Sequence, residues 1–112
     1  MSTTEGKAIV YCEDAFRTTY GKTAHGLVRF TRRYNVLSVV DSTCHGNDAG
    51  ELLDGRPNGI PIVESVAAGV ERARAAEVPA THMVIGLAPD GGVLDPRTRE
   101  AIRLAVTLGL NV

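Results

Sequence analysis

Hydroxyl, amine and guanidinium side chains are concentrated in residues 17–23, whose sequence is RTTYGKT. The last three letters match the end of a Walker A phosphate loop, a motif that also has a glycine five residues before the glycine of this GKT. Phe16 occupies that position, so the usual Walker cradle is excluded, as is the GxGxxG pattern of a dinucleotide fold. A turn that leads into a helix can still bind an anion, because the first N–H groups of a helix and its dipole attract negative charge.

The stretch therefore predicts an anion site of another kind, for a phosphate or a carboxylate. We expect the backbone N–H groups of residues 21–23 to be unpaired and to point outward, with Lys22 and Arg17 supplying positive charge and the threonines supplying hydroxyl donors. The predicted site consists of Arg17, Thr18, Thr19, Gly21, Lys22 and Thr23. The alternative is a solvated loop in which the threonines only cap a helix.

The sequence around this loop predicts strands and helices that alternate along the chain. Short apolar runs with β-branched residues predict strands at 7–12, 35–41, 60–65 and 81–88. Apolar residues at helical spacing, with capping residues beside them, predict helices at 23–34, 47–55, 66–77 and 95–109. Residues 110–112 begin what we expect to be a fifth strand. The alternation predicts one α/β domain over residues 1–112, a Rossmann-like three-layer sandwich with a parallel sheet of four to five strands.

Open parallel sheets bind ligands at the carboxyl ends of their strands, where several loops of this chain should meet. Asp41 ends the second strand 20 residues after Gly21, and an acid at that spacing can hold a ribose hydroxyl, although aspartate is also common at strand ends without a ligand. Residues 88–92, APDGG, favour either an anion nest or a plain turn. The ligand-binding residues predicted in these other loops are Asp41, Ser42, Thr43, Gly91 and Gly92.

Composition excludes several classes of function. The chain has 112 residues and a net charge of −1, so no basic field indicates binding to nucleic acid or to an acidic membrane. No apolar run approaches the ~20 residues of a membrane span, and the polar first residues do not match a signal peptide. Cys12 and Cys44 form no CxxC pair and are expected to be reduced thiols of a cytoplasmic protein. A metal site from these cysteines and His45 lacks ligand spacing, so no metal is predicted.

Several segments together resemble the N-terminal domain of the D-glutamate N-acetyltransferase family, long described as a domain of unknown function. The most specific of them are GKTAHGLVR at 21–29 and DGRPNGIPIV at 54–63, and the resemblance extends from residue 7 to residue 112. It implies a two-part protein, in which the Rossmann-like domain is followed by a larger P-loop domain with its own Walker A motif. This chain contains only the first part, which implies that it is not catalytic alone.

A weaker similarity connects the chain to the CoA-binding domains of acyl-CoA ligases. It rests on GIPIVESVAAGVERA at 59–73 and EAIRLAVTLGLNV at 100–112. In that family the first glycine loop holds the CoA phosphates. The similarity implies that residues 18–23 would take this role here, without the usual glycine pattern.

These observations favour a ligand-binding domain for a phosphate-bearing small molecule, either CoA, acetyl-CoA or a nucleotide. The alternative is a non-catalytic assembly or oligomerisation module, because the short last strand leaves an open sheet edge that a second copy or the P-loop partner domain would cover. A third hypothesis is an independent enzyme that uses Cys44 or His45. The sequence shows no acid–base constellation with firm spacing to support it.

Overall fold

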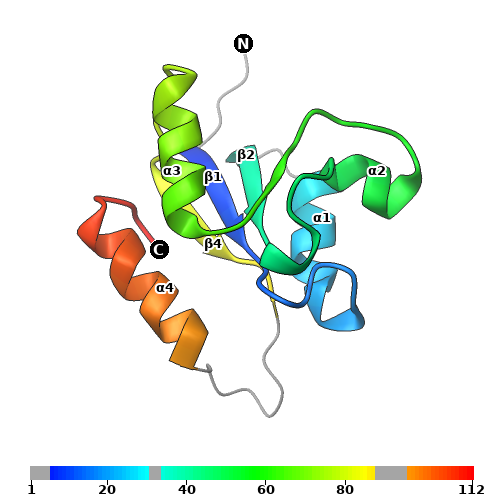
Figure 1. Cartoon of the computed structure of the whole chain (residues 1–112), viewed down its shortest axis with the longest axis horizontal. Helices are drawn as coiled ribbons and strands as arrows, with labels where there is room; N and C mark the ends of the chain where they lie inside the picture. The colour runs from blue at the N-terminus through cyan, green and yellow to red at the C-terminus, as the bar shows by residue number, and fades with distance from the viewer. Residues whose placement is uncertain (1–5, 31–33, 88–95) are drawn as a thin grey trace.

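We describe the protein from a computed structural model, in which residues 6–30, 34–87 and 96–112 are described (Figure 1). The strands are β1 Gly6–Tyr11, β2 Tyr34–Val40, β3 Ile62–Val63 and β4 His82–Ile85. The α-helices are α1 Lys22–Phe30, α2 Ala49–Asp54, α3 Val66–Ala75 and α4 Pro96–Thr107. Two short 3-10 turns, η1 Thr19–Gly21 and η2 Ser42–Cys44, follow β1 and β2.

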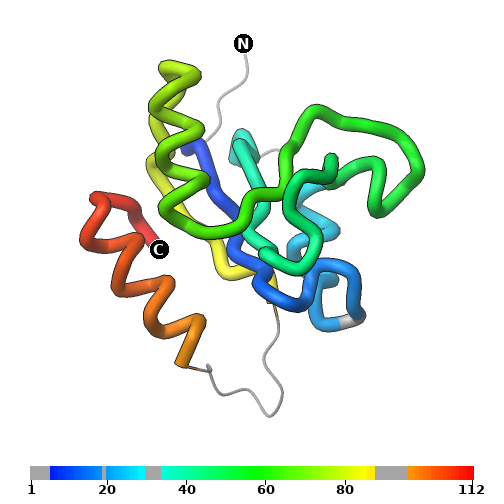
Figure 2. The backbone as a smooth tube through the Cα atoms, in the orientation of Figure 1, coloured from blue at the N-terminus to red at the C-terminus, as the bar shows by residue number. Residues whose placement is uncertain are grey.

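The four strands form one parallel sheet in the order β3-β2-β1-β4. Helix α1 connects β1 to its neighbour β2, and α2 connects β2 to the edge strand β3. Helix α3 then leads back to β4, which lies on the other side of β1. Right-handed crossovers therefore place α1 and α2 on one face of the sheet and α3 and α4 on the other, as Figures 1 and 2 show. The predicted Rossmann-like sandwich is confirmed.

Each face of the sheet has its own hydrophobic core, because alternate residues of a strand point to opposite faces. Ile9 and Tyr11 of β1 pack with residues of α3 and α4. Val10 and Cys12 pack on the other face with residues of α1 and α2. Phe16, in the loop after β1, is fully buried in this second core. Burial on both faces explains why the strands appear in the sequence as continuous apolar runs.

Capping residues set the ends of several helices as the sequence predicts. The side chain of Asp48 accepts the N–H of Glu51 to begin α2, and Gly55 ends that helix with a left-handed φ of 74°. Ser65 caps α3 through the N–H of Ala68. The predicted cap of α4, at residue 95, lies outside the described residues.

The third strand is much shorter than the predicted 60–65, and this expectation was wrong at both ends. Pro61 has no N–H to donate to the sheet. Ile60 accepts the N–H of Ala49, and Ile62 donates to Asn47, so these residues pair with the start of α2 on their outer side. The first helix does not extend to the predicted residue 34, since Tyr34 already belongs to β2 and pairs with Gly6.

The expected fifth strand is reduced to one residue, Asn111. Gly109 has a φ of 86° and turns the chain at the end of α4. Asn111 then donates to Thr81 O at 2.9 Å and accepts the N–H of Met83 at 2.7 Å, which places it beside β4. The sheet therefore continues past β4 by a single bridge.

None of the helices in the described ranges is long and apolar enough to cross a membrane.

Replacing Gly86 with alanine should destabilise the protein, because this glycine lets α1 lie close to the sheet. An added Cβ would lie 2.6 Å from Val10 Cγ1 and 2.8 Å from Ala24 Cβ, and such overpacking costs about 1–3 kcal/mol. The control is Gly26→Ala within α1, where nothing lies within 4 Å of the added Cβ and a gain of about 0.5–1 kcal/mol is expected. Urea denaturation measures the free energy of unfolding of both variants. Equal free energies for Gly86→Ala and Gly26→Ala would contradict the close packing at Gly86.

Candidate ligand site at the carboxyl edge of the sheet

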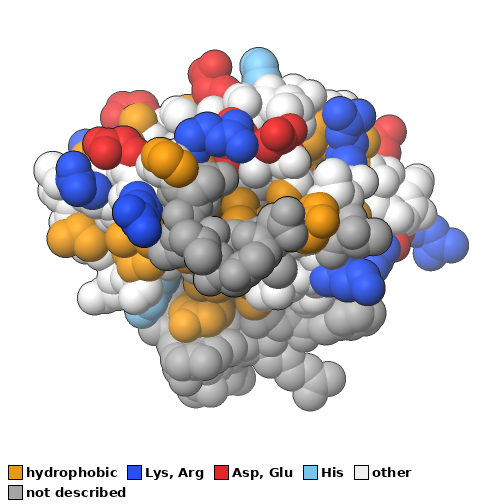
Figure 3. Space-filling view, turned by 90° about the horizontal axis from the view of Figure 1, so that it is seen from below, with side chains coloured by type: hydrophobic (Ala, Val, Ile, Leu, Met, Phe, Trp, Pro, Cys, Tyr) orange, Lys and Arg blue, Asp and Glu red, His pale blue; other side chains and the backbone are white. Residues whose placement is uncertain are grey.

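The order of the strands reverses direction at β1, because β2 lies on one side of it and β4 on the other. Ligands of open α/β sheets bind outside the carboxyl ends of the strands at such a point. Figure 3 views the molecule from this edge and shows hydrophobic side chains near its centre, with charged side chains of both signs around them. Gly91 and Gly92, which were predicted to bind here, lie outside the described residues.

The loop after β1 is folded into consecutive turns. Ala15 N–H donates to Cys12 O at 3.1 Å, and Thr18 N–H donates to Ala15 O at 2.9 Å. Phe16 anchors the loop in the core, where its ring meets the ring of His25 edge-on at 5.3 Å. The position at which a Walker A motif has glycine is therefore a packing anchor in this protein.

Gly21 has a packing role that the sequence did not reveal. An added Cβ would lie 2.5 Å from Ala15 O and 3.1 Å from Phe16 Cα. Its N–H donates to Thr18 O at 3.1 Å, so the expectation of an unpaired, outward-pointing N–H was wrong for Gly21. The N–H of Ala24, one turn on, donates to Gly86 O at 2.9 Å and fixes the start of α1 against the end of β4. For Lys22 and Thr23 the expectation stays a prediction.

The polar side chains of this loop divide into a capping residue and exposed residues. The Thr18 hydroxyl donates to Ala15 O at 2.8 Å and accepts the N–H of Tyr20 at 3.2 Å, so it caps the turn η1. Arg17, Lys22 and Thr23 are exposed. The side chain of Thr19 lies outside the described part of the structure. The exposed groups leave a guanidinium and an ammonium available to an anion.

Asp41 is buried, with 1% of its surface exposed, and its carboxylate accepts four hydrogen bonds. Two of these come from the N–H groups of Asp14 and Phe16, both at 3.1 Å, and two from the N–H and hydroxyl of Thr43. Burial alone raises the pKa of this carboxyl, but the hydrogen bonds hold its pKa below the ordinary value. Asp41 therefore fixes the loop after β1, and its burial does not favour the predicted contact with a ribose.

Ser42 and Thr43 follow Asp41 in the turn η2 and are exposed. The Ser42 N–H and hydroxyl donate to the two carboxylate oxygens of Glu13, at 2.5 and 2.6 Å. The Thr43 hydroxyl donates to Asp41 at 2.6 Å. The structure thus brings these predicted residues together with the loop after β1, where their side chains connect the two loops.

A cavity of about 310 Å³ lies at the same edge, on the face of the sheet that carries α3 and α4. Its lining residues are Tyr11, Glu13, Val40, Glu64, Ser65, Val66, Arg97, Glu100, Ala101 and Leu104. The three carboxylates outnumber the one guanidinium, so the cavity attracts cationic groups and hydrogen-bond donors and repels phosphate. Arg17 and Lys22, the two cationic residues of the loop after β1 and the start of α1, do not line this cavity.

The sequence reasoning did not single out the charged residues of this cavity. Glu13 and Glu64 follow the carboxyl ends of β1 and β3, and this position was the signal that could have identified them. Arg97 and Glu100 lie on α4, and only the packing of that helix against the sheet brings them to the edge.

The two cysteines are poor nucleophiles. Burial, followed by the charge of Asp41, raises the pKa of Cys12 to about 12 and that of Cys44 to about 11. Both therefore stay protonated near neutral pH, which weighs against an independent enzyme that uses Cys44. His45 is exposed beside them, and within the described ranges no group of three His, Cys, Asp or Glu side chains could hold a metal ion.

Replacing Asp41 with asparagine should lower the free energy of unfolding by about 2–3 kcal/mol at neutral pH, because an amide cannot accept all the bonds of the buried carboxylate. Since the folded-state pKa is lowered, the charged form contributes stability above the unfolded-state pKa of about 3.9. That contribution is lost as the pH falls through the folded-state pKa. The difference between wild type and variant should be constant from about pH 7 to about pH 5 and narrow below about pH 4.

Urea denaturation across this pH range measures the effect of Asp41→Asn. Glu71→Gln is the control, because this carboxylate lies exposed on α3, and it should change stability little. A difference for Asp41→Asn that stays the same down to about pH 2 would contradict a lowered pKa.

Comparison with known proteins gives the family of the chain. A family model described as a Rossmann-like domain of unknown function, DUF1611_N, matches residues 42–112. A crystal structure of a DUF1611 family protein from Anabaena variabilis is similar, with a TM-score of 0.79 and 27% sequence identity. The match covers 94% of this chain and 28% of that protein, so the chain spans less than a third of its relative. None of the curated proteins matches. The chain therefore belongs to the DUF1611_N family of Rossmann-like domains.

Proposed function

We propose that the chain is the ligand-binding domain of a larger protein that acts as a D-glutamate N-acetyltransferase, and that it binds a phosphate-bearing small molecule without being catalytic alone. CoA, acetyl-CoA or a nucleotide would supply the phosphate. The observation that carries the proposal is the pair of exposed cationic residues, Arg17 and Lys22, beside a rigid loop at the switch point of a parallel sheet.

The rigidity of this loop supports binding there. Asp41 holds the backbone at Asp14 and Phe16, and Gly86 holds the start of α1, so Arg17 and Lys22 extend from a fixed backbone. A ligand would then order only the two side chains, which keeps the entropic cost of binding low. The helix dipole at the start of α1 adds to the attraction for an anion.

The groups at the edge support a domain that is not catalytic alone. Both thiols are protonated near neutral pH, and the Asp41 carboxylate is buried. The relative from Anabaena is more than three times as long as the matched part, which supports a second domain that completes the active site. Cys12 and Cys44 are free thiols, in keeping with a cytoplasmic protein.

Replacing Lys22 with alanine should weaken binding of CoA or ATP by roughly 1.5–3 kcal/mol, the range of one charged hydrogen bond. Isothermal titration of wild type and variant measures the change. Arg74→Ala is the matched control, because this exposed arginine lies in the last turn of α3, toward the opposite edge of the sheet. Equal affinities of Lys22→Ala and wild type, or no binding by either, would contradict the proposal and show that the loop only caps a helix.

A second candidate function is assembly, which the open edge beyond Asn111 favours. Among the described residues Asn111 forms a bridge with β4 alone, and Val106 of α4 and Val112 are 61% and 57% exposed. We propose that a second copy of the chain, or the P-loop domain of the larger protein, covers this edge.

The isolated chain should therefore form a homo-oligomer at high concentration, through the edge at Asn111. Light scattering measures the mass of the particles in solution. Val106→Glu should lower that mass toward the mass of the monomer, because a charge is costly in an apolar interface. Leu52→Glu places the same charge on α2, on the other face of the sheet, and should leave the mass unchanged. A monomer at every concentration would argue against the self-association.

A further inference from the structure

A second cavity has no part in the carboxyl-edge site. It measures about 570 Å³ and lies between α1, α2 and the loop that follows α2. Its lining residues are Val28, Arg29, Gly50, Asp54, Arg56, Pro57 and Asn58. Arg29 is in the last turn of α1, whereas Lys22 is its first residue, so the two sites lie at opposite ends of the helix.

The loop at 55–59 is held rigidly on α2. The carboxylate of Asp48 accepts the N–H groups of Glu51, Asn58 and Gly59, at 3.0, 2.9 and 2.9 Å. Gly50 allows the close approach, since an added Cβ would lie 2.6 Å from Asn58 Cγ and 2.7 Å from Arg56 O. The side chains of the loop therefore start from a fixed backbone.

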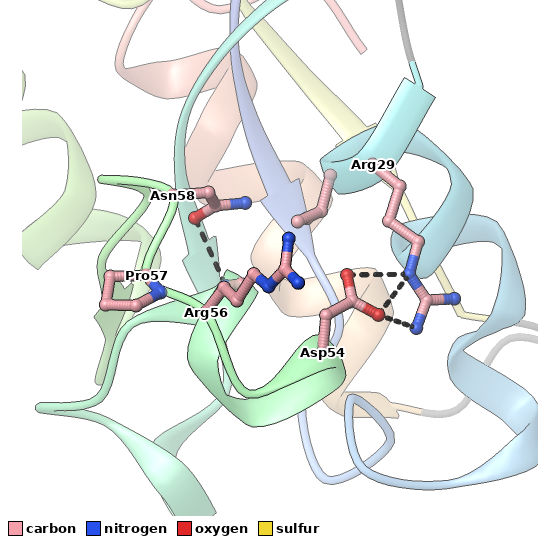
Figure 4. A pocket seen from close by; sticks show the side chains of 7 residues that line it. Arg29, Asp54, Arg56, Pro57 and Asn58 are labelled. Carbon is pink, nitrogen blue, oxygen red and sulfur yellow. Dashed lines mark hydrogen bonds and ion pairs between the residues drawn. The ribbon is translucent and has the colours of Figure 1, made fainter.

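The hydrogen bonds of Asn58 determine which end of its amide is available. Its Oδ1 accepts the N–H groups of Gly50 and Ile60, both at 3.1 Å. The opposite end, Nδ2, must then be a donor. Figure 4 shows this nitrogen and the guanidinium of Arg56 directed into the same space.

The other arginine of the cavity is already paired. Arg29 donates to both carboxylate oxygens of Asp54, with Nη2 at 2.6 Å from Oδ1 (Figure 4). The hydrogen bond from Arg29 lowers the pKa of Asp54, and the charge of Arg56 adds to this. Asp54 is thus engaged by Arg29, and within the described residues Arg56 makes no ion pair of its own.

We propose that this cavity is a separate binding site for the oxyanion of a small molecule, either a carboxylate or a phosphate. Two donors, Arg56 and Asn58 Nδ2, are directed into the same space, and two guanidiniums against one carboxylate leave a net positive charge. A guanidinium offers paired N–H groups that match the oxygens of either anion. Val28 and Pro57 supply apolar contact for the rest of the ligand, and the volume is that of a small-molecule site.

Amide NMR of the 112-residue chain, titrated with sodium phosphate and separately with sodium acetate at constant ionic strength, tests the proposal. We expect saturable shifts at Gly50, Ile60 and the side-chain amide of Asn58. The anion that binds more tightly distinguishes a phosphate site from a carboxylate site. Arg56→Gln should weaken the tighter anion at least tenfold and leave the thermal midpoint unchanged, because the side chain is exposed.

Two control variants separate this site from general anion attraction and from the carboxyl-edge site. Arg72→Gln removes an exposed charge on α3 and should leave the affinity unchanged. Lys22→Ala, at the opposite end of α1, should also leave the anion affinity of this cavity unchanged. A failure of this proposal is therefore independent of the function proposed above. Shifts that increase linearly with concentration, or equal affinities for Arg56→Gln and wild type, would overturn the proposal.

Discussion

The buried carboxylate of Asp41 is the interaction on which the carboxyl edge of the sheet depends. A charge that is 1% exposed is tolerated only where hydrogen bonds replace its water, and four such bonds are present. They come from the loop after β1 and from the turn after β2, so one side chain joins the two. Two hydrogen bonds from Ser42 to Glu13 connect the same two loops, with the donors in the turn after β2 and the acceptor in the loop after β1. Neighbouring strands thus end in a single rigid unit.

Close packing of α1 completes that unit. Gly21 and Gly86 each occupy a place where a Cβ would meet other atoms at 2.5–2.6 Å, one against Ala15 and the other against Val10. The helix can lie this close only because both residues lack a side chain. The acidic cavity lies on the other face of the sheet from α1, and Arg97 in its lining lies 3.8 Å from the carboxylate of Asp14 in the loop after β1.

The fold could be predicted from the sequence because it depends on local patterns, whereas the site depends on contacts between distant segments. Strands buried on both faces appear as apolar runs, and Asp48 and Ser65 are recognisable caps. The role of Gly21 is set instead by the carbonyl of Ala15, and nothing in GKT reveals it. Glu100 joins the acidic cavity only after α4 has packed beside β1. Strand β3 is short because Ile60, which precedes it, pairs with Ala49 at the start of α2.

Helix α1 links the two proposed sites, since its first residue is Lys22 and its last turn contains Arg29. Both ends are fixed from outside the helix, by Gly86 at the start and by Asp54 near the end. This helix of nine residues is therefore anchored at both ends, to the end of β4 and to α2. Residues 21–29 contain Gly21 and most of this helix, and residues 54–63 run from the end of α2 to β3. The ion pair between Arg29 and Asp54 joins these two segments, and it engages the one carboxylate of the cavity that Arg56 would otherwise pair with.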